Sequence, residues 1–200
     1  LDVLFDAFAR ERAEALENVR AMLGDPSYIE FSEGLKGIFS DPKEMIIGPS
    51  GEMPTGNYAR GIVLKRYRKV AGIALVINDE TPDATVHALR IQCKKLRYLL
   101  EFFTPLFLAK SIKPLIKALK GLQDMLGRFN DYSVQREALD AFVDAHPMRG
   151  KKGLKLAESV GALVVTLYQL QKKTRQEIED GIADFVNDET KKRFEALKPK

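Results

Sequence analysis

The segment from His87 to Phe103 places cationic side chains at the spacing of one helix face. At about 100° per residue, a single arc of roughly 100° holds the polar positions His87, Arg90, Lys94, Arg97, Tyr98 and Glu101. Leucines and Cys93 fall on the opposite arc, so we expect a helix that buries one face and displays the other. Guanidinium and ammonium groups in such a row donate hydrogen bonds to phosphate oxygens. The chemistry offered by this face is the binding of an anion.

A solvated basic surface is the alternative interpretation of a single helix of this kind. The segment 111–126 repeats the pattern, however, because one arc of about 60° holds Lys113, Lys117, Lys120 and Asp124. Its opposite face is apolar, with Ile112, Leu115, Leu119, Leu122 and Leu126. Consecutive helices with a short connection pack antiparallel. We therefore expect the two cationic faces to form one basic patch, and the helix 58–78 adds a less regular basic face with Lys65, Arg68 and Lys69.

The net charge of +4 conceals an uneven distribution along the 200 residues. Residues 1–57 contain 5 Lys and Arg against 11 acidic residues, residues 58–128 contain 14 against 5, and residues 129–200 contain 13 against 12. The excess of cations thus lies in the part of the chain that holds the His87 helix. Such a concentration indicates a polyanionic partner, whether nucleic acid, an anionic surface or a phosphate polymer.

Other classes of protein are disfavoured by what the sequence contains. The single cysteine, Cys93, cannot form an internal disulfide, and its place on an apolar face predicts an inert thiol. The two histidines, His87 and His146, have no paired carboxylates beside them, so we expect no metal and no other cofactor. No arrangement of a nucleophile with a base is apparent, so we expect no catalysis by this chain alone. Without a membrane-length apolar run or a signal-peptide pattern, a cytoplasmic protein is expected.

Apolar periodicity predicts an all-α fold, an antiparallel bundle of long helices. We expect helices over 1–23, 26–39, 58–78, 83–104, 111–126, 132–145 and 154–186, and a final amphipathic turn around Phe194. Gly24 is expected to end the first helix in the left-handed conformation, and Asp25 with Pro26 to begin the second. Thr81 is the expected cap of the His87 helix, Gly127 the end of its successor, and Asn130 with Asp131 the cap of the next. Residues 41–57 form the one long irregular loop.

Two motifs in these helices resemble the CHAD family, the conserved-histidine α-helical domain. The first is His87-x-x-Arg90-x-x-x-Lys94-Lys95-x-Arg97-Tyr98-x-x-Glu101, and the second is Leu122-Gln123-x-x-Leu126-Gly127-x-x-Asn130-Asp131. The resemblance is strong over residues 82–140 and follows helix order over 1–81 and 141–200. It implies two related helical-bundle halves and a basic surface that binds inorganic polyphosphate. It also implies phosphate contacts from His87, Arg90, Lys94, Lys95 and Arg97, with Lys113, Lys117 and Lys120.

The resemblance also predicts how the chain is organised. We expect one CHAD-like helical domain over residues 1–200, with 1–40 as the end of the first repeat and 58–200 as the second repeat. The opening Leu1-Asp2-Val3 aligns with Tyr132-Ser133-Val134, just after the second motif. The first part of the first repeat is therefore expected to be missing from this sequence.

Three functions follow as hypotheses. The leading one is a module that binds inorganic polyphosphate or another phosphate polyanion, with an expected location in the cytoplasm at polyphosphate granules. A second is a nucleic-acid-binding protein, with weak and non-specific binding. A third is the accessory domain of a triphosphatase, because some family members are fused to one in the same polypeptide. For His87, phosphate binding, a structural role and metal ligation all remain open.

Overall fold

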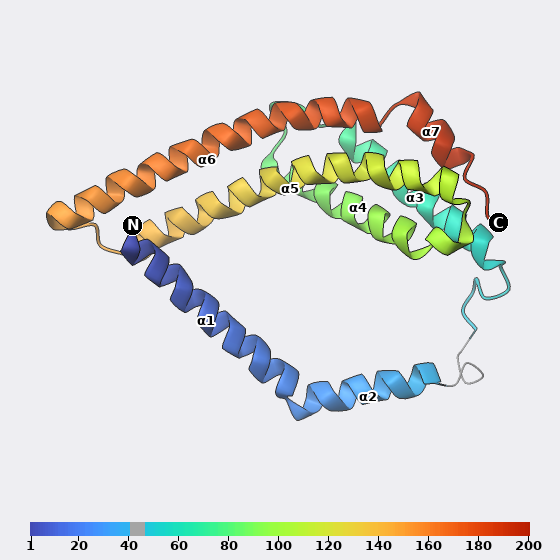
Figure 1. The fold of residues 1–200 in the computed structure, drawn as a ribbon, viewed down its shortest axis with the longest axis horizontal. Coiled ribbons are helices and arrows are strands. Elements are labelled where there is room, and N and C mark those ends of the chain that lie inside the picture. Colours follow the sequence, from blue (N-terminus) through green and yellow to red (C-terminus); the bar gives the residue numbers. More distant parts are fainter. Residues whose placement is uncertain (41–46) are drawn as a thin grey trace. The chain divides into compact units, whose positions relative to one another are not determined.

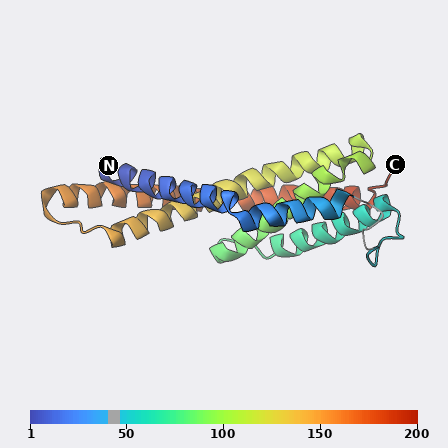
Figure 2. The ribbon, with the colours of Figure 1, turned by 90° about the horizontal axis from the view of Figure 1, so that it is seen from below.

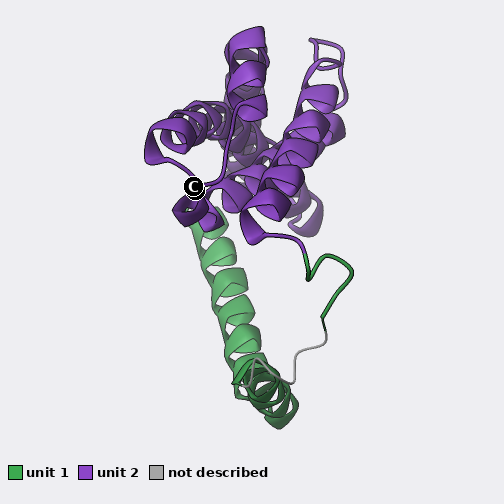
Figure 3. Cartoon of the chain, turned by 90° about the vertical axis from the view of Figure 1, so that its right-hand side faces the viewer, with its two compact units in different colours: residues 1–52 green, residues 53–200 purple. Residues whose placement is uncertain are grey.

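A computed structural model describes residues 1–40 and 47–200 of the chain (Figure 1). The described residues contain no strand, which confirms the all-α prediction. Their elements are α1 (Asp2–Gly24), α2 (Pro26–Ser40), α3 (Thr55–Ala74), α4 (Asp83–Phe102), the short 3-10 helix η1 (Thr104–Leu106), α5 (Ala109–Ala145), α6 (Gly150–Phe185) and α7 (Asp188–Glu195). They divide into two compact units, Leu1–Glu52 and Met53–Lys200 (Figure 3).

The first unit consists of α1 and α2, which meet at Asp25. The Asp25 carboxylate accepts a hydrogen bond from the backbone N–H of Ser27 at 2.8 Å, so it caps α2 as predicted. The left-handed end predicted at Gly24 is wrong, because Gly150 is the glycine with positive φ among the described residues. An extended Asp25 ends α1 instead.

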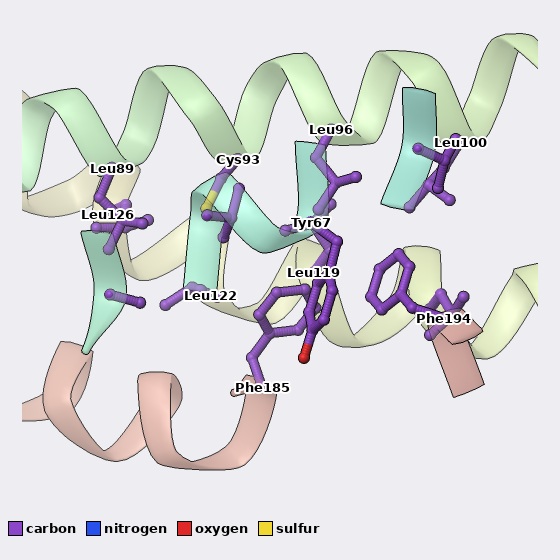
Figure 4. Packing of buried hydrophobic residues seen from close by; sticks show 14 of the residues in the cluster. Tyr67, Leu89, Cys93, Leu96, Leu100, Leu119, Leu122, Leu126, Phe185 and Phe194 are labelled. Carbon is purple, nitrogen blue, oxygen red and sulfur yellow. The ribbon is translucent and has the colours of Figure 1, made fainter. Parts of the chain in front are cut away.

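The core of the second unit is a cluster of buried side chains from α3, α4, α5, the end of α6 and α7 (Figure 4). At its centre the Tyr67 ring stacks on Phe194, with 4.0 Å between ring centroids, and meets Phe185 edge to face. Burial raises the pKa of the Tyr67 hydroxyl, and the nearby carboxylates of Glu195 and Asp188 raise it further. The core therefore ties the last two helices to α3.

Helix α5 is one continuous element, so the predicted break at Gly127 is wrong. Asn130 and Asp131 lie inside the helix and do not cap a new one. The reason is that the apolar face continues through the supposed break, with Leu126 and Phe129 both buried. Glycine and asparagine here follow the conformation that tertiary packing imposes, against their weak helix propensity.

Two helix starts also differ from the prediction. Helix α3 begins at Thr55 after Pro54, so the predicted loop ends earlier than residue 57, and residues 41–46 of that loop lie outside the described residues. The Thr81 side chain does not cap α4, for which Pro82 occupies the capping position. The Thr81 hydroxyl instead donates to the Val76 carbonyl at 3.0 Å and closes the turn before α4.

Helices α5 and α6 run side by side and extend together beyond the rest of the second unit (Figures 1 and 2). The apolar period of residues 154–186 predicts that five side chains of this helix point inward: Leu156, Val160, Leu163, Leu167 and Leu170. Val160 is buried, but Leu163 and Leu170 are 37% and 38% exposed. A pair of helices covers only part of each apolar face, so the inward prediction is wrong for these two leucines.

Candidate functional site

Helices α4 and α5 pack against each other in antiparallel directions. The short η1 connection joins the end of α4 to the start of α5, and His87 near the start of α4 reaches Asn130 far along α5. In Figure 4, Leu89, Cys93, Leu96 and Leu100 of α4 point into the same buried cluster as the leucines of α5. This packing turns the polar sides of both helices toward solvent, as the periodicity predicted.

The start of α4 is fixed to α6 by Arg175. Its guanidinium donates to the Thr81 carbonyl at 2.7 Å and to the Asn78 carbonyl at 3.2 Å, and it forms an ion pair with Asp83. The Gln171 amide nitrogen also donates to the Asp83 carboxylate at 2.7 Å. These contacts set the position of the first turns of α4, and with them the position of His87.

The imidazole of His87 meets the side chain of Asn130, with 2.5 Å between Nδ1 and Oδ1. Because a carbonyl oxygen can only accept, Nδ1 carries the hydrogen in this contact and Nε2 faces away from it. His87 is exposed, so Nε2 is free to meet a ligand. The contact joins the two sequence motifs through a pair of residues that their spacing does not predict.

Cationic side chains continue from His87 along the boundary between the two helices. We call this boundary the α4–α5 edge; it comprises His87, Arg90, Lys94 and Arg97 of α4 with Lys120, Gln123 and Asn130 of α5. On α4, the three edge cations are half-buried, whereas Lys95, about 80° from His87 around the helix, is exposed. Arg90 and Lys94 have no hydrogen bond or ion pair with any described residue. Their charges are available to a ligand.

Arg97 is partly engaged within α4. Its Nε lies 3.4 Å from a Glu101 carboxylate oxygen, and its guanidinium carbon lies 5.6 Å from the centre of the Tyr98 ring. Glu101 thus offsets one charge of the row, as expected from its i,i+4 spacing. Tyr98 is 52% exposed and adds an aromatic surface to the cationic edge.

The remaining predicted cations of α5 lie beside the edge or beyond it. Lys113, Lys117 and Lys120 are all exposed. Lys117 lines a cavity of about 410 Å³ on the side of α5 that meets α6, together with Asp184 and Arg193. The α5 cations therefore share one exposed arc of the helix, with Lys117 at its border toward α6, and Lys120 is nearest to the level of Arg97 in the antiparallel packing.

The predicted cations of α3 are separate from the α4–α5 edge. Lys65 and Lys69 are exposed, and Arg68 lines a cavity of about 460 Å³ with Asp188 and Lys191 near α7. The arginine of α3 that turns toward α4 is Arg66, which donates to the Gln92 side chain at 2.5 Å. Of the predicted α3 cations, Arg68 thus lies toward α7 and not toward the α4–α5 edge.

Gln123, the second residue of the second motif, is buried beside the edge. Its side chain is buried at 7% exposure, and neither its amide oxygen nor its amide nitrogen has a hydrogen-bond partner among the described residues. The Arg97 Nε is likewise buried without a hydrogen bond. The sequence signal for this residue is a glutamine on the leucine-rich face of the helix. Buried amides normally have hydrogen-bond partners, so a glutamine at such a position indicates a partner or a ligand.

Other candidate chemistry was also tested against the structure. Among the residues it describes, there is no cluster of three or more His, Cys, Asp or Glu that could hold a metal ion. His146 stacks on Phe142, with its Nδ1 2.9 Å from the Phe142 carbonyl oxygen. Cys93 is fully buried, and burial raises the pKa of its thiol to about 12, as its apolar position predicted. None of the helices in the described ranges is long and apolar enough to cross a membrane.

Comparison with known proteins agrees with this geometry. No curated protein gives a significant match to the sequence. The family model for the CHAD domain matches residues 1–140, which include both motifs and the His87–Asn130 contact between them. Since that match covers more than half of the sequence, the chain belongs to the CHAD domain family.

Proposed function

We propose that the α4–α5 edge binds inorganic polyphosphate or a similar phosphate polyanion. One observation carries the proposal: the His87–Asn130 contact brings both family motifs to one end of a row of cations, of which Arg90 and Lys94 lack any partner among the described residues. Membership of the CHAD family is consistent with polyphosphate binding or with a triphosphatase context. Like charges along one helix destabilise the unliganded protein slightly, which a polyanion would reverse.

The geometry suits a chain of phosphates better than a single one. His87 and Arg97 are ten residues apart on α4, so the row extends over about 15 Å. Ammonium and guanidinium groups at intervals of three or four residues can each take a different phosphate. Binding of this kind depends mainly on the release of counterions from the polymer.

Binding is proposed without catalysis by this chain. Glu101, the acidic residue of the α4 row, is engaged in an ion pair with Arg97. A triphosphatase, whether fused or separate, would supply any chemistry on the bound chain. The α4–α5 edge would then retain the polymer near that enzyme.

Nucleic acid is the second candidate, and Tyr98 is the observation that favours it. An exposed aromatic ring beside cations can stack on a base, which increases the affinity for single strands. The two candidate functions predict different contacts, because a polyphosphate site contacts only phosphates whereas a single-strand site also stacks bases. Tyr98→Ala should leave polyphosphate affinity nearly unchanged and weaken RNA binding if bases stack there.

A competition experiment tests the proposal. Long-chain polyphosphate should displace labelled RNA at a far lower phosphate concentration than RNA displaces labelled polyphosphate. Lys94→Glu should weaken polyphosphate binding strongly, whereas the same charge change at the exposed Lys155 of α6 should weaken it only slightly. Equal losses in the two variants would show that net charge, and not the α4–α5 edge, determines binding.

A further inference from the structure

We propose that Gln123 is a further ligand-binding residue of the α4–α5 edge, and that its side-chain amide donates a hydrogen bond to a phosphate oxygen of the bound polyanion. The inference rests on the proposed function, because it assigns a new contact to the same site. It starts from the one residue of the edge that is both buried and wholly unpartnered.

The helix register places Gln123 in the row of binding groups. Gln123 lies seven residues before Asn130 on α5, and Lys94 lies seven residues after His87 on α4. Seven residues are close to two turns, so each pair shares a face to within about 20°. Because the helices are antiparallel, both shifts run in the same direction along the edge. Gln123 is therefore expected at the level of Lys94. This level is about 10 Å further along the edge than the His87–Asn130 pair.

The two amides of α5 nevertheless differ in their partners. The Asn130 oxygen is taken by His87, whereas both polar atoms of Gln123 are free of hydrogen bonds within the described part of the chain. The Arg97 Nε, one turn beyond Lys94, is also buried without a hydrogen bond. That nitrogen still has an ion-pair partner in Glu101, whereas the Gln123 amide has neither kind of partner within the described residues.

Gln171 shows what a structural glutamine looks like in this fold. It is equally buried, at 4% exposure, but its amide nitrogen donates to Asp83 at 2.7 Å and its oxygen accepts from Arg136 at 2.6 Å. A buried amide without such partners destabilises the unliganded fold. An apolar residue at position 123 would avoid that penalty, so the amide is explained by a ligand that completes its hydrogen bonds.

Both polar atoms of Gln123 are buried, so a ligand reaches the amide only after a side-chain movement, which we assign to Lys94 because the helix register places it at the same level. This side chain is half-buried at the level of Gln123, and its flexible four-carbon chain can turn outward to a phosphate. That motion opens the way to the Gln123 amide nitrogen. The amide oxygen is then placed to accept from the Lys94 ammonium, so that one phosphate is held by a cation and a neutral donor together.

The test compares Gln123→Met with Lys94→Met and with the control Gln92→Met, a half-buried glutamine of α4 whose side chain accepts from Arg66 of α3. For each variant, polyphosphate affinity is measured over a range of salt concentrations, and thermal unfolding is measured without ligand. Gln123→Met should weaken binding roughly tenfold to a hundredfold, as expected for a hydrogen bond to a charged group. Its salt dependence should stay that of the wild type, because an amide displaces no counterion, and its melting temperature should rise.

The two other variants should change the salt dependence of binding and the melting temperature. Lys94→Met should make the slope of log affinity against log salt shallower by about 0.7 to 0.9. Gln92→Met, which removes the acceptor of the Arg66 hydrogen bond outside the α4–α5 edge, should lower the melting temperature and leave the affinity unchanged. If Gln123→Met binds as the wild type while Lys94→Met binds weakly, the inference is overturned and the proposed function stands. If Lys94→Met also binds normally, the proposed function itself fails.

A second variant covers a failure to fold. If Gln123→Met is not folded, Gln123→Leu provides the same comparison with a shorter apolar side chain. Unfolding of both variants would overturn the inference, because the fold itself would then need the amide.

Discussion

His87 obtains its orientation from Asn130, and this single contact decides what the ring can offer a ligand. With Nδ1 held by the Asn130 oxygen at 2.5 Å, Nε2 is the atom that remains for a phosphate. A neutral ring would present an acceptor there, and a protonated ring a donor. Histidine and asparagine thus act as one unit at the end of the row.

A double-mutant cycle tests this coupling. We predict that His87→Ala and Asn130→Ala each weaken polyphosphate binding, and that the double variant loses less than the sum of the two. The expected coupling is about 0.5–3 kcal/mol, because the residues are in direct contact. Affinities measured by titration calorimetry provide the four corners of the cycle. Strictly additive losses would mean that Asn130 does not orient the ring.

The buried thiol of Cys93 leads to a prediction about its chemical reactivity and about the pH dependence of stability. With its pKa raised to about 12 by burial, the thiol should resist iodoacetamide at pH 8 in the folded protein and react readily in denaturant. The ordinary value is 9.0, so folding favours the protonated thiol. Its contribution to stability is complete below about pH 9 and is lost as pH rises toward 12.

A variant isolates that contribution from other groups that titrate at high pH. The difference in unfolding free energy between wild type and Cys93→Ala should shrink as pH rises above 9. Rapid alkylation of the folded protein at pH 8, or a difference independent of pH, would contradict a buried thiol.

The packing of α4 and α5, the two helices that carry the site, depends on their buried apolar faces. Leu96 of α4 is fully buried in the cluster, whereas Leu75 at the end of α3 is 72% exposed. We predict that Leu96→Ala lowers the free energy of unfolding by about 2–5 kcal/mol. Leu75→Ala should change it by about 0.5 kcal/mol or less. Denaturant unfolding measures both, and a loss below 1 kcal/mol for Leu96→Ala would mean that the helix faces the other way.

The continuity of α5 through Gly127 leads to a second prediction about the helices. Gly127 has no positive φ, and a Cβ added there would have no neighbour within 4 Å among the described residues. Gly127→Ala should therefore stabilise the protein by about 0.8–1 kcal/mol through helix propensity. Had Gly127 ended a helix in the left-handed conformation, alanine would destabilise it instead. Thermal unfolding of the single variant distinguishes the two conformations.

The same helix shows how far the sequence could predict the site. The 3.6-residue period placed the cations of α4 on one side and Leu89, Leu96 and Leu100 on the other, and the structure agrees. Local rules failed at Gly127 and Asn130, because these residue types favour helix ends while the buried Leu126 and Phe129 keep α5 continuous. The His87–Asn130 contact joins residues 43 positions apart, and no local pattern predicts such a pairing.

At the scale of the whole molecule, charge is divided between the two compact units. Residues 1–52 contain 5 Lys and Arg against 11 acidic residues, and all remaining 27 cations lie in residues 53–200 with 17 acids. The buried cluster behind the α4–α5 edge is built entirely from residues 59–197. The second unit thus holds both the core and the proposed site.

Removing the first unit tests this division. We predict that a chain of residues 53–200 unfolds cooperatively and binds polyphosphate at least as tightly as the full chain, because it loses six net negative charges. Calorimetric unfolding and a binding titration measure the two properties. A truncated chain that does not fold would show that the second unit depends on the first.

The most direct test of the account is the salt dependence of polyphosphate binding by the full chain. Seven motif cations define the scale: Arg90, Lys94, Lys95, Arg97, Lys113, Lys117 and Lys120. If binding is driven by counterion release, log affinity falls linearly with log salt, by about 0.7–0.9 for each neutralised phosphate. Because not every cation reaches the polymer, we predict a slope of about −3 to −6 and no preference for any nucleotide sequence. A slope shallower than about −1, or a marked preference for one RNA sequence, would contradict phosphate recognition at the α4–α5 edge.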